Sequence, residues 1–384
     1  MSLLFSPGRI GKLTLKNRFV RSATYDGCAG KGGIVSPQQV KLFSDLADGG
    51  VGLIITGITY THPLGQISAF QNSLAHDDCI SGFRELTQEV HKRGAKIAVQ
   101  VFHAGKERAK FCRSGLSPSL SEEDRELSGT CRAMKETEIQ EVIHSFGDAA
   151  RRAQEAGFDS IQIHAAHGYL LSQFLSPLTN SRIDEWGGAL ENRLRLHREI
   201  YQDIRAKVGK EFPVIIKIGV QDGLPDGLRF EEGKEAARLL AEWGYDALEI
   251  SLGLRGKGYE NSEFKTKVNR TDREAYFRDW CREIESQTQV PLIMVGGLRT
   301  FAIMEEAVAR GDSDFVSLSR PLIREPDIIN KWKEDNNYKA KCLSCNKCFE
   351  ALLNRESLHC VQEAEAANSV YQMPAKPTVH GGTD

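Results

Sequence analysis

Eight short apolar runs alternate with segments of helical spacing along the 384-residue chain. The segment 137–157 is typical of the second kind, because its apolar residues recur with a helical period and it ends on a glycine. Strands that are apolar on both faces and separated by helices form parallel sheets, and eight such units close a (β/α)8 barrel. We therefore predict a (β/α)8 TIM barrel, with strands in residues 19–25, 51–56, 96–103, 158–166, 213–220, 247–253, 291–297 and 315–320.

The chain is expected to have two parts, an α/β barrel over residues 1–335 and a C-terminal cysteine-rich extension and tail over 336–384. Two segments that follow predicted strands are longer than the connections that a barrel requires. Residues 104–135 form a polar insertion on the face where barrels keep their active sites, and we expect it to cap a substrate. Residues 254–270 carry five basic residues and are interpreted as a solvated loop rather than an anion site. The tail from Gln362 onward is expected to be poorly ordered.

Charge and composition narrow the classes of partner. With 50 basic and 52 acidic residues, the formal net charge is -2, which argues against nucleic-acid and membrane partners. The N-terminus does not resemble a signal peptide and no apolar stretch is long enough to span a membrane, so we expect a cytoplasmic protein. Nine cysteines, unevenly spaced, suit metal chemistry better than a disulfide framework. The oligomeric state is left open, a homo-oligomer included.

Polar and small residues gather at the predicted C-terminal ends of the strands, which converge on one mouth in a β/α barrel. A lysine inside an apolar strand is costly without an anionic partner, so Lys217 indicates a buried negative group, which a ligand could supply. The glycine pair and the arginine match the place where barrels bind phosphate. The candidates are Ser22, Thr24, Tyr25, Gln100, His103, His164, His167, Lys217, Gly296, Gly297, Ser319 and Arg320.

Each candidate alone also has a structural explanation. A histidine at a strand end is more often structural, paired glycines are common in turns, and an arginine before proline can cap a helix. Convergence on one face favours a functional site. The spacing of His164 and His167 could also suggest a metal pair, but the nearest acid, Asp184, lies well beyond the turn, so metal hydrolysis is the weaker hypothesis.

The run "IHAAHGYLLSQFLSPLTNSRIDEWGGALENR" (163–193) resembles the signature of the Old Yellow Enzyme family of FMN-dependent ene-reductases. The likeness extends to "LKNRFVRSAT" (15–24), "VQVFHAGK" (99–106), "VGG" (295–297) and "SRPLIREP" (319–326). The resemblance implies an FMN-dependent enzyme that acts on a small-molecule substrate and reduces a C=C bond activated by a carbonyl group.

The resemblance also implies a role for each candidate. Gln100 would hydrogen-bond the pyrimidine edge of the flavin ring, and Lys217 would face its N1–C2=O edge. Gly296, Gly297 and Arg320 would hold the phosphate, with Ser319 beside it. Residues Ser22, Ala23, Thr24 and Tyr25 would complete the cofactor site. Tyr25 departs from the family pattern, because many relatives have at this position a Thr or Cys that tunes the flavin.

His164 and His167 would grip the substrate oxygen in such an enzyme, and Tyr169 would donate a proton. Hydride transfer to the β-carbon builds negative charge on the carbonyl oxygen, which two imidazole donors can stabilise as an oxyanion hole does. The α-carbon then needs a proton. A phenol with a pKa of about 10 is still protonated at neutral pH and can donate it.

Four cysteines follow the barrel in the pattern C-x2-C-x2-C-x11-C, at Cys342, Cys345, Cys348 and Cys360. This spacing is typical of [4Fe–4S] binding. Zinc is the alternative, although four-cysteine zinc sites more often use two separated C-x-x-C pairs. The pattern also resembles the branch of the family that contains 2,4-dienoyl-CoA reductase and trimethylamine dehydrogenase.

Three functions remain open on the sequence. The first is an ene-reductase, in which NAD(P)H reaches the flavin directly, since no G-x-G-x-x-G unit follows the cysteines. The second is a demethylating or dehydrogenating flavoenzyme that passes electrons through the cluster to a carrier protein. The third is an electron-transfer subunit of a larger complex.

Overall fold

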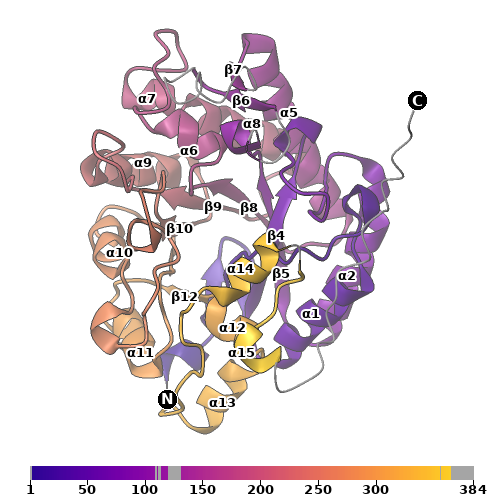
Figure 1. The fold of residues 1–384 in the computed structure, drawn as a ribbon, viewed down its shortest axis with the longest axis vertical. Helices are drawn as coiled ribbons and strands as arrows, with labels where there is room; N and C mark the ends of the chain where they lie inside the picture. Colours follow the sequence, from indigo (N-terminus) through magenta and orange to yellow (C-terminus); the bar gives the residue numbers. More distant parts are fainter. Residues whose placement is uncertain (1, 109, 111–113, 120–130, 355, 365–384) are drawn as a thin grey trace.

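A closed barrel of eight parallel strands forms the centre of the computed structural model, which describes residues 2–108, 110, 114–119, 131–354 and 356–364 (Figure 1). The strands follow one another around the barrel in chain order, and each lies within one of the predicted runs or overlaps it, so the predicted barrel is confirmed. They are β3 (Phe19–Arg21), β4 (Leu53–Tyr60), β5 (Lys96–Phe102), β8 (Ser160–Ala165), β9 (Val214–Gly219), β10 (Ala247–Ser251), β11 (Leu292–Met294) and β12 (Phe315–Leu318).

An antiparallel hairpin that the sequence analysis did not predict closes the N-terminal end of the barrel. It consists of β1 (Gly8–Ile10) and β2 (Leu13–Leu15). Its Ile10, Leu13 and Leu15 pack in one buried cluster with inward-facing strand residues, among them Ala98 and Ile215. The hairpin therefore seals this end with apolar side chains, which leaves the opposite end as the open mouth.

Amphipathic helices surround the barrel and bury their apolar faces in a second, larger core. Helix α1 begins with a capping box between Ser36 and Gln39. The longer helices are α1 (Pro37–Asp48), α2 (Ile80–Lys92), α5 (Glu136–Glu155), α8 (Arg195–Val208), α9 (Phe230–Trp243), α10 (Arg278–Glu285) and α11 (Phe301–Ala309). The shorter ones are α6 (Leu170–Leu175), α7 (Leu190–Arg193), α12 (Arg320–Arg324), α13 (Ile328–Glu334), α14 (Lys347–Leu353) and α15 (Val361–Ala364).

The segment after the barrel folds back toward the mouth. Figure 1 shows α14 and α15 in yellow near α12, in front of the barrel strands. The proposed division of the chain at residue 335 stays a prediction. Of the insertion predicted to cap a substrate, residues 109, 111–113 and 120–130 lie outside the described residues, and the described part includes β6 (Gly115–Ser117) and β7 (Cys131–Ala133). The tail was expected to be poorly ordered from Gln362 onward, but residues 362–364 belong to α15, and the rest of the tail lies outside the described residues.

None of the helices that the structure describes combines the length and the apolar character that a membrane span requires.

Candidate active site

A cavity of about 770 Å³ opens at the C-terminal mouth of the barrel. Its size is within the range of about 300–1,000 Å³ that is usual for ligand pockets. Of the barrel residues predicted at the mouth, His103 is fully buried and does not line this cavity. The others all line it: Ser22, Ala23, Thr24, Tyr25, Gln100, His164, His167, Tyr169, Lys217, Gly296, Gly297, Ser319 and Arg320. The structure thus brings together residues that are up to 298 positions apart in the chain.

A polar layer lies at the bottom of the cavity, and two of its three residues, Gln100 and Lys217, line it. Side chains on a strand alternate between its two faces, so a residue two positions beyond an inward-facing one also points inward. Ala98, Ile215 and Ala247 belong to the apolar layer above the hairpin. Two positions further along each of these strands stand Gln100, Lys217 and Glu249. The barrel interior therefore changes from apolar to charged within one layer of side chains.

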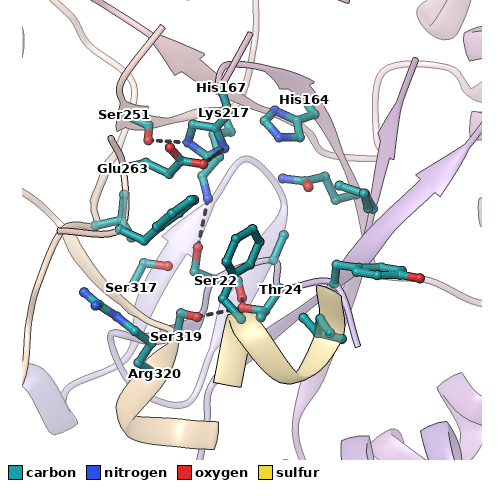
Figure 2. Close-up of a pocket in the computed structure, with 18 of the residues that line it drawn as sticks. Ser22, Thr24, His164, His167, Lys217, Ser251, Glu263, Ser317, Ser319 and Arg320 are labelled. Atoms are coloured by element: carbon teal, nitrogen blue, oxygen red, sulfur yellow. Dashed lines mark hydrogen bonds and ion pairs between the residues drawn. The ribbon is translucent and has the colours of Figure 1, made fainter. Parts of the chain in front are cut away.

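Lys217 has the buried anionic partner that its place in an apolar strand predicted. Its Nζ lies 3.2 Å from Oε1 of Glu249 on the adjacent strand, and the two side chains are 4% and 0% exposed. The protein supplies this anion, which corrects the expectation that a ligand could do so. Lys217 also donates to Ser22 Oγ at 2.9 Å, drawn as a dashed line in Figure 2, and Ser22 in turn donates to Glu249 at 2.9 Å.

His164, His167 and Tyr169 pack edge to face where β8 ends. The ring centroids of the two histidines are 4.9 Å apart, and those of His164 and Tyr169 are 5.1 Å apart. Phe102 packs edge to face against the Tyr169 ring at 4.9 Å. His167 adopts a positive φ of 60°. This left-handed turn, followed by Gly168, sends the chain from the strand into α6 and keeps all three rings together.

The hydrogen bonds define which ring nitrogens can donate. The backbone N–H of Ala166 donates to Nδ1 of His164 at 3.3 Å, so the proton of a neutral His164 is on Nε2. Nδ1 of His167 lies 3.6 Å from a carboxylate oxygen of Glu263, and Nε2 lies 2.7 Å from Ser251 Oγ (Figure 2). The negative charge of Glu263 favours the tautomer in which Nδ1 of His167 carries the proton and Nε2 accepts from Ser251. At 3.6 Å this contact is longer than a hydrogen bond.

Burial controls the protonation of all three rings. It lowers the pKa of His164 well below the ordinary value, and the neighbouring His167 and Lys217 lower it further. Burial, followed by the charges of Lys217 and Arg255, does the same to the pKa of His167. The pKa of Tyr169 is raised by burial, which Arg255 partly opposes. At neutral pH the site therefore holds two neutral imidazoles and one protonated phenol.

The basic loop 254–270 is only partly a solvated loop, which corrects its interpretation from charge alone. Lys257, Lys267 and Arg270 are exposed. Arg255, however, lines the cavity together with Glu263 from the same loop. Its Nε lies 2.9 Å from both carboxylate oxygens of Glu263, and its guanidinium lies 5.8 Å from the centroid of the Tyr169 ring. Nothing in the sequence predicted that this ion pair covers the catalytic candidates.

The other end of the cavity combines glycines, a serine and an arginine. Gly296 and Gly297 have φ angles of 117° and 74°. An added Cβ would come within 2.9 Å of Phe277 and Tyr276 at Gly296, and within 2.7 Å of Tyr276 and Val268 at Gly297. Only glycine therefore fits at either position. Ser317 also lines this end, and its buried hydroxyl has no hydrogen-bond partner among the described residues.

Comparison with known proteins identifies the family. The profile of the NADH:flavin oxidoreductase / NADH oxidase family matches residues 3–339. The chain belongs to this family. It is 36% identical over 98% of its length to the NADH oxidase of Thermoanaerobacter brockii, and 33% identical over 93% to the cinnamate reductase of Clostridium sporogenes. A solved 2-naphthoyl-CoA reductase superposes on 93% of the chain with a TM-score of 0.85 and 26% identity.

The chain spans 59%, 57% and 56% of these three proteins, respectively. Within the matched region, the family is one of FMN-linked oxidoreductases, and the resemblance noted in the sequence is confirmed. The described residues fit that cofactor. The glycine pair leaves bare backbone at one end of the cavity, the unpartnered Ser317 hydroxyl faces the same end, and the Lys217 ammonium is presented at the floor.

The four cysteines of the extension surround a separate cavity of about 20 Å³. All four line it, and proximity to the other three thiols adds to burial in raising the pKa of Cys348 to about 11. Ser344 and Asn346, on either side of Cys345, have positive φ angles, and the Ser344 N–H lies 3.4 Å from the Cys342 sulfur. No set of three or more ligand side chains in the described residues has a metal-binding arrangement as it stands.

The extension also forms part of the larger cavity. Cys342, Ser344, Phe349, Leu352, Leu353 and Glu356 all line it. Helix α14 thereby covers the mouth over Ser22 and Thr24, and Figure 2 shows the yellow helix beside them. No signal in the sequence placed these residues there, because the fold-back of the extension is a matter of tertiary packing.

Proposed function

We propose that this protein is an FMN-dependent oxidoreductase that reduces a C=C bond activated by a carbonyl or carboxylate oxygen. The observation that carries the proposal is the joint placement of two neutral imidazoles and a protonated phenol at one cavity wall. The relative named cinnamate reductase supports this class of substrate. NADH or NADPH is the proposed electron donor, and the cytoplasmic location stays a prediction from the sequence.

Bound FMN would supply the hydride, from N5 of its ring, to the β-carbon of the substrate. The residues of the chain would hold it at both ends. Gln100 and Lys217 at the cavity floor would bind the pyrimidine edge of the ring. Gly296, Gly297 and Arg320 would bind the phosphate, with backbone groups and a guanidinium. The segment Ser22 to Tyr25, together with Ser319, would line the space between.

The substrate oxygen would accept hydrogen bonds from His164 Nε2–H and His167 Nδ1–H. The first is the donor left after Nδ1 has accepted from the backbone, and the second has no short contact to Glu263. Negative charge that grows on this oxygen would be stabilised by both donors in a buried site. Tyr169 would then deliver its proton to the α-carbon, and Phe102 and His164 would fix the ring for that transfer.

The cysteine group would hold a [4Fe–4S] cluster, with Cys342, Cys345, Cys348 and Cys360 as ligands. The donor set and its spacing suit such a cluster, and zinc is the alternative. The small cavity between the thiols and the Ser344 N–H directed at the Cys342 sulfur support a metal-thiolate site, since hydrogen bonds to sulfur are common there. The thiols would converge further when they bind the metal.

A second candidate function is a flavin dehydrogenase or electron-transfer subunit that passes electrons through the cluster to a partner protein. The two cavities favour it, because Arg320 and Cys342 line both of them. The flavin and cluster sites would therefore share a wall.

The direction of electron flow distinguishes the two functions. Anaerobically purified protein, with FMN quantified after release, is mixed with NADH, with NADPH and, separately, with a tertiary amine such as dimethylglycine. The ene-reductase proposal predicts one FMN per chain, bleached by a nicotinamide and not by the amine. Bleaching by the amine alone would favour the dehydrogenase, and absence of FMN would contradict both.

A further inference from the structure

Lys217, the cation at the cavity floor, forms an ion pair with Glu249. Lys217 lines the cavity, whereas Glu249, which is fully buried, is not among the residues that line it. Ser22 lies between them, because its Oγ accepts from Lys217 and donates to Glu249, each at 2.9 Å. The Glu249 carboxylate therefore does not touch the contents of the cavity, and its contacts lead to them through Lys217, Ser22 and the residues bonded to its second oxygen.

The second oxygen of Glu249 begins a chain of side-chain amides. Oε2 accepts from Gln162 Nε2 at 2.8 Å, and Oε1 of Gln162 accepts from Gln100 Nε2 at 2.8 Å. A carboxylate can only accept, so Gln162 must turn its amide nitrogen toward Glu249 and its oxygen toward Gln100. Gln100 must then donate to Gln162, and its own oxygen is left as an acceptor for the cavity. Glu249 thus fixes the orientation of both amides.

We propose that Glu249 is the positioning residue that sets the polarity of the ring-binding end of the cavity. Through one oxygen it balances the charge of Lys217, and through the other it makes Gln100 present an acceptor. The inference rests on the proposed function in that FMN is the ligand. It predicts that Glu249 keeps the site from over-stabilising negative charge on the pyrimidine edge, since the Lys217 ammonium is already paired with a carboxylate before any ligand arrives.

Sulfite affinity of the FMN-loaded protein measures this property without turnover. The lone pair of the sulfite sulfur forms a bond to flavin N5, the ring's C=N double bond is lost, and the displaced electron pair becomes negative charge on the N1–C2=O edge. The adduct bleaches the flavin absorbance. In Glu249→Gln, the unshared Lys217 charge should tighten sulfite binding by about tenfold or more, because a nearby buried cation favours the anionic form.

Glu325→Gln is the matched control. Glu325 is also buried and lies 3.2 Å from a lysine, Lys331, but it does not line the cavity. Its sulfite affinity should equal that of the unaltered protein. Placing Glu249→Gln on a Lys217→Met background should abolish most of the effect, because Glu249 is argued to act on the anion mainly through Lys217.

Unchanged or weaker sulfite binding in Glu249→Gln would overturn the inference, as would an equal tightening in the Lys217→Met background. If Glu249→Gln does not fold, Glu249→Asp tests the same point, because the shorter side chain draws the charge away from Lys217 and should tighten sulfite binding to a smaller degree. An unaltered protein that binds no FMN would overturn the proposed function and this inference together, whereas normal FMN content with equal sulfite affinities would overturn this inference alone.

Discussion

Arg320 Nη1 donates a hydrogen bond to Asn346 Oδ1 at 2.7 Å, which ties the end of the barrel to the turn between Cys345 and Cys348. The same Nη1 donates to the carbonyl of Lys265 at 2.8 Å, and Asn346 Nδ2 donates to the carbonyl of Phe264. The proposed phosphate-binding arginine is therefore held by the cysteine-rich extension and by the loop that covers the cavity.

This arrangement predicts that Arg320 and Asn346 both affect FMN retention. Arg320→Ala should raise the dissociation constant of FMN by about tenfold to a hundredfold, the usual loss for a charge-assisted hydrogen bond. Asn346→Ala should raise it less, because it only frees the guanidinium to move. Equilibrium dialysis measures both. Arg324→Ala, on the same short helix but outside the larger cavity, should bind FMN normally; an equal loss in that variant would contradict the assignment.

The two histidines should be required together for binding anions that imitate the enolate. In His164→Ala/His167→Ala, the long-wavelength absorbance band that phenolates produce with oxidised flavin should disappear, because both N–H donors are lost. The exposed surface residue His144 serves as the control, and His144→Ala should keep the band. A band that persists in the double variant would remove the oxygen-binding role.

Tyr169→Phe should separate the two halves of the reaction. Reduction of the flavin by the nicotinamide should proceed at its normal rate, while reoxidation by a weakly activated enone should slow by about a hundredfold or more, the usual contribution of a general acid. Stopped-flow absorbance measures each half-reaction. Tyr259→Phe, outside the cavity, should match the unaltered protein. Equal reoxidation rates in Tyr169→Phe would transfer the proton donor to water or another residue.

The cysteine group predicts about four irons per chain in anaerobically prepared protein, since each thiolate binds one corner of a [4Fe–4S] cluster. Cys345→Ala should lose iron and keep FMN, because Cys345 lines the small cavity and not the larger one. Cys131→Ala, outside the group, should keep both. One zinc per chain would favour the structural alternative. Neither metal in fresh anaerobic protein would contradict a metal site.

A buried histidine away from the site makes the stability depend on pH. Burial lowers the pKa of His197 to about 3, and neither ring nitrogen has a partner in the described part of the chain. Its unfolded pKa is about 6.5, so the unfolded chain takes up the proton first as the pH falls. The stability that neutral His197 contributes is therefore present above pH about 6.5 and is lost below it, at about 1.4 kcal/mol per pH unit.

Urea unfolding of His197→Leu at two pH values tests this. Between pH about 7.5 and pH about 5.5, the variant should lose about 1.4 kcal/mol less free energy of unfolding than the unaltered protein does. The same loss in both proteins would show that His197 is not held neutral by burial.

The sequence predicted the barrel because its eight apolar runs and intervening helices leave few other parallel arrangements. It also predicted the mouth residues, since strand ends converge there whatever the details of packing. The signal that selected Lys217, a charged residue inside an apolar strand, is equally present at Glu249, which stands in "ALEIS". The pairing of Glu249 with Lys217 could not be predicted, because it depends on the register between two adjacent strands.

The covering elements could not be predicted from the sequence. In the sequence, Arg255 and Glu263 do not differ from other charged loop residues. Only the structure shows that their loop covers Tyr169. The spacing of Phe349 and Leu352 predicts only that they share one face of a short helix. They line the cavity because α14 packs over its mouth. Loops and terminal segments reach such positions through long-range packing, which has no period in the sequence.

The central claim, reduction of an activated alkene, is tested most directly in a single turnover. The protein with FMN bound is reduced by light under anaerobic conditions, mixed with cyclohex-2-enone or cinnamate, and followed by flavin absorbance and product analysis. The account predicts rapid return of the oxidised flavin spectrum and one saturated product per FMN with at least one of the two substrates. Flavin that stays reduced with both, and no saturated product, would contradict it.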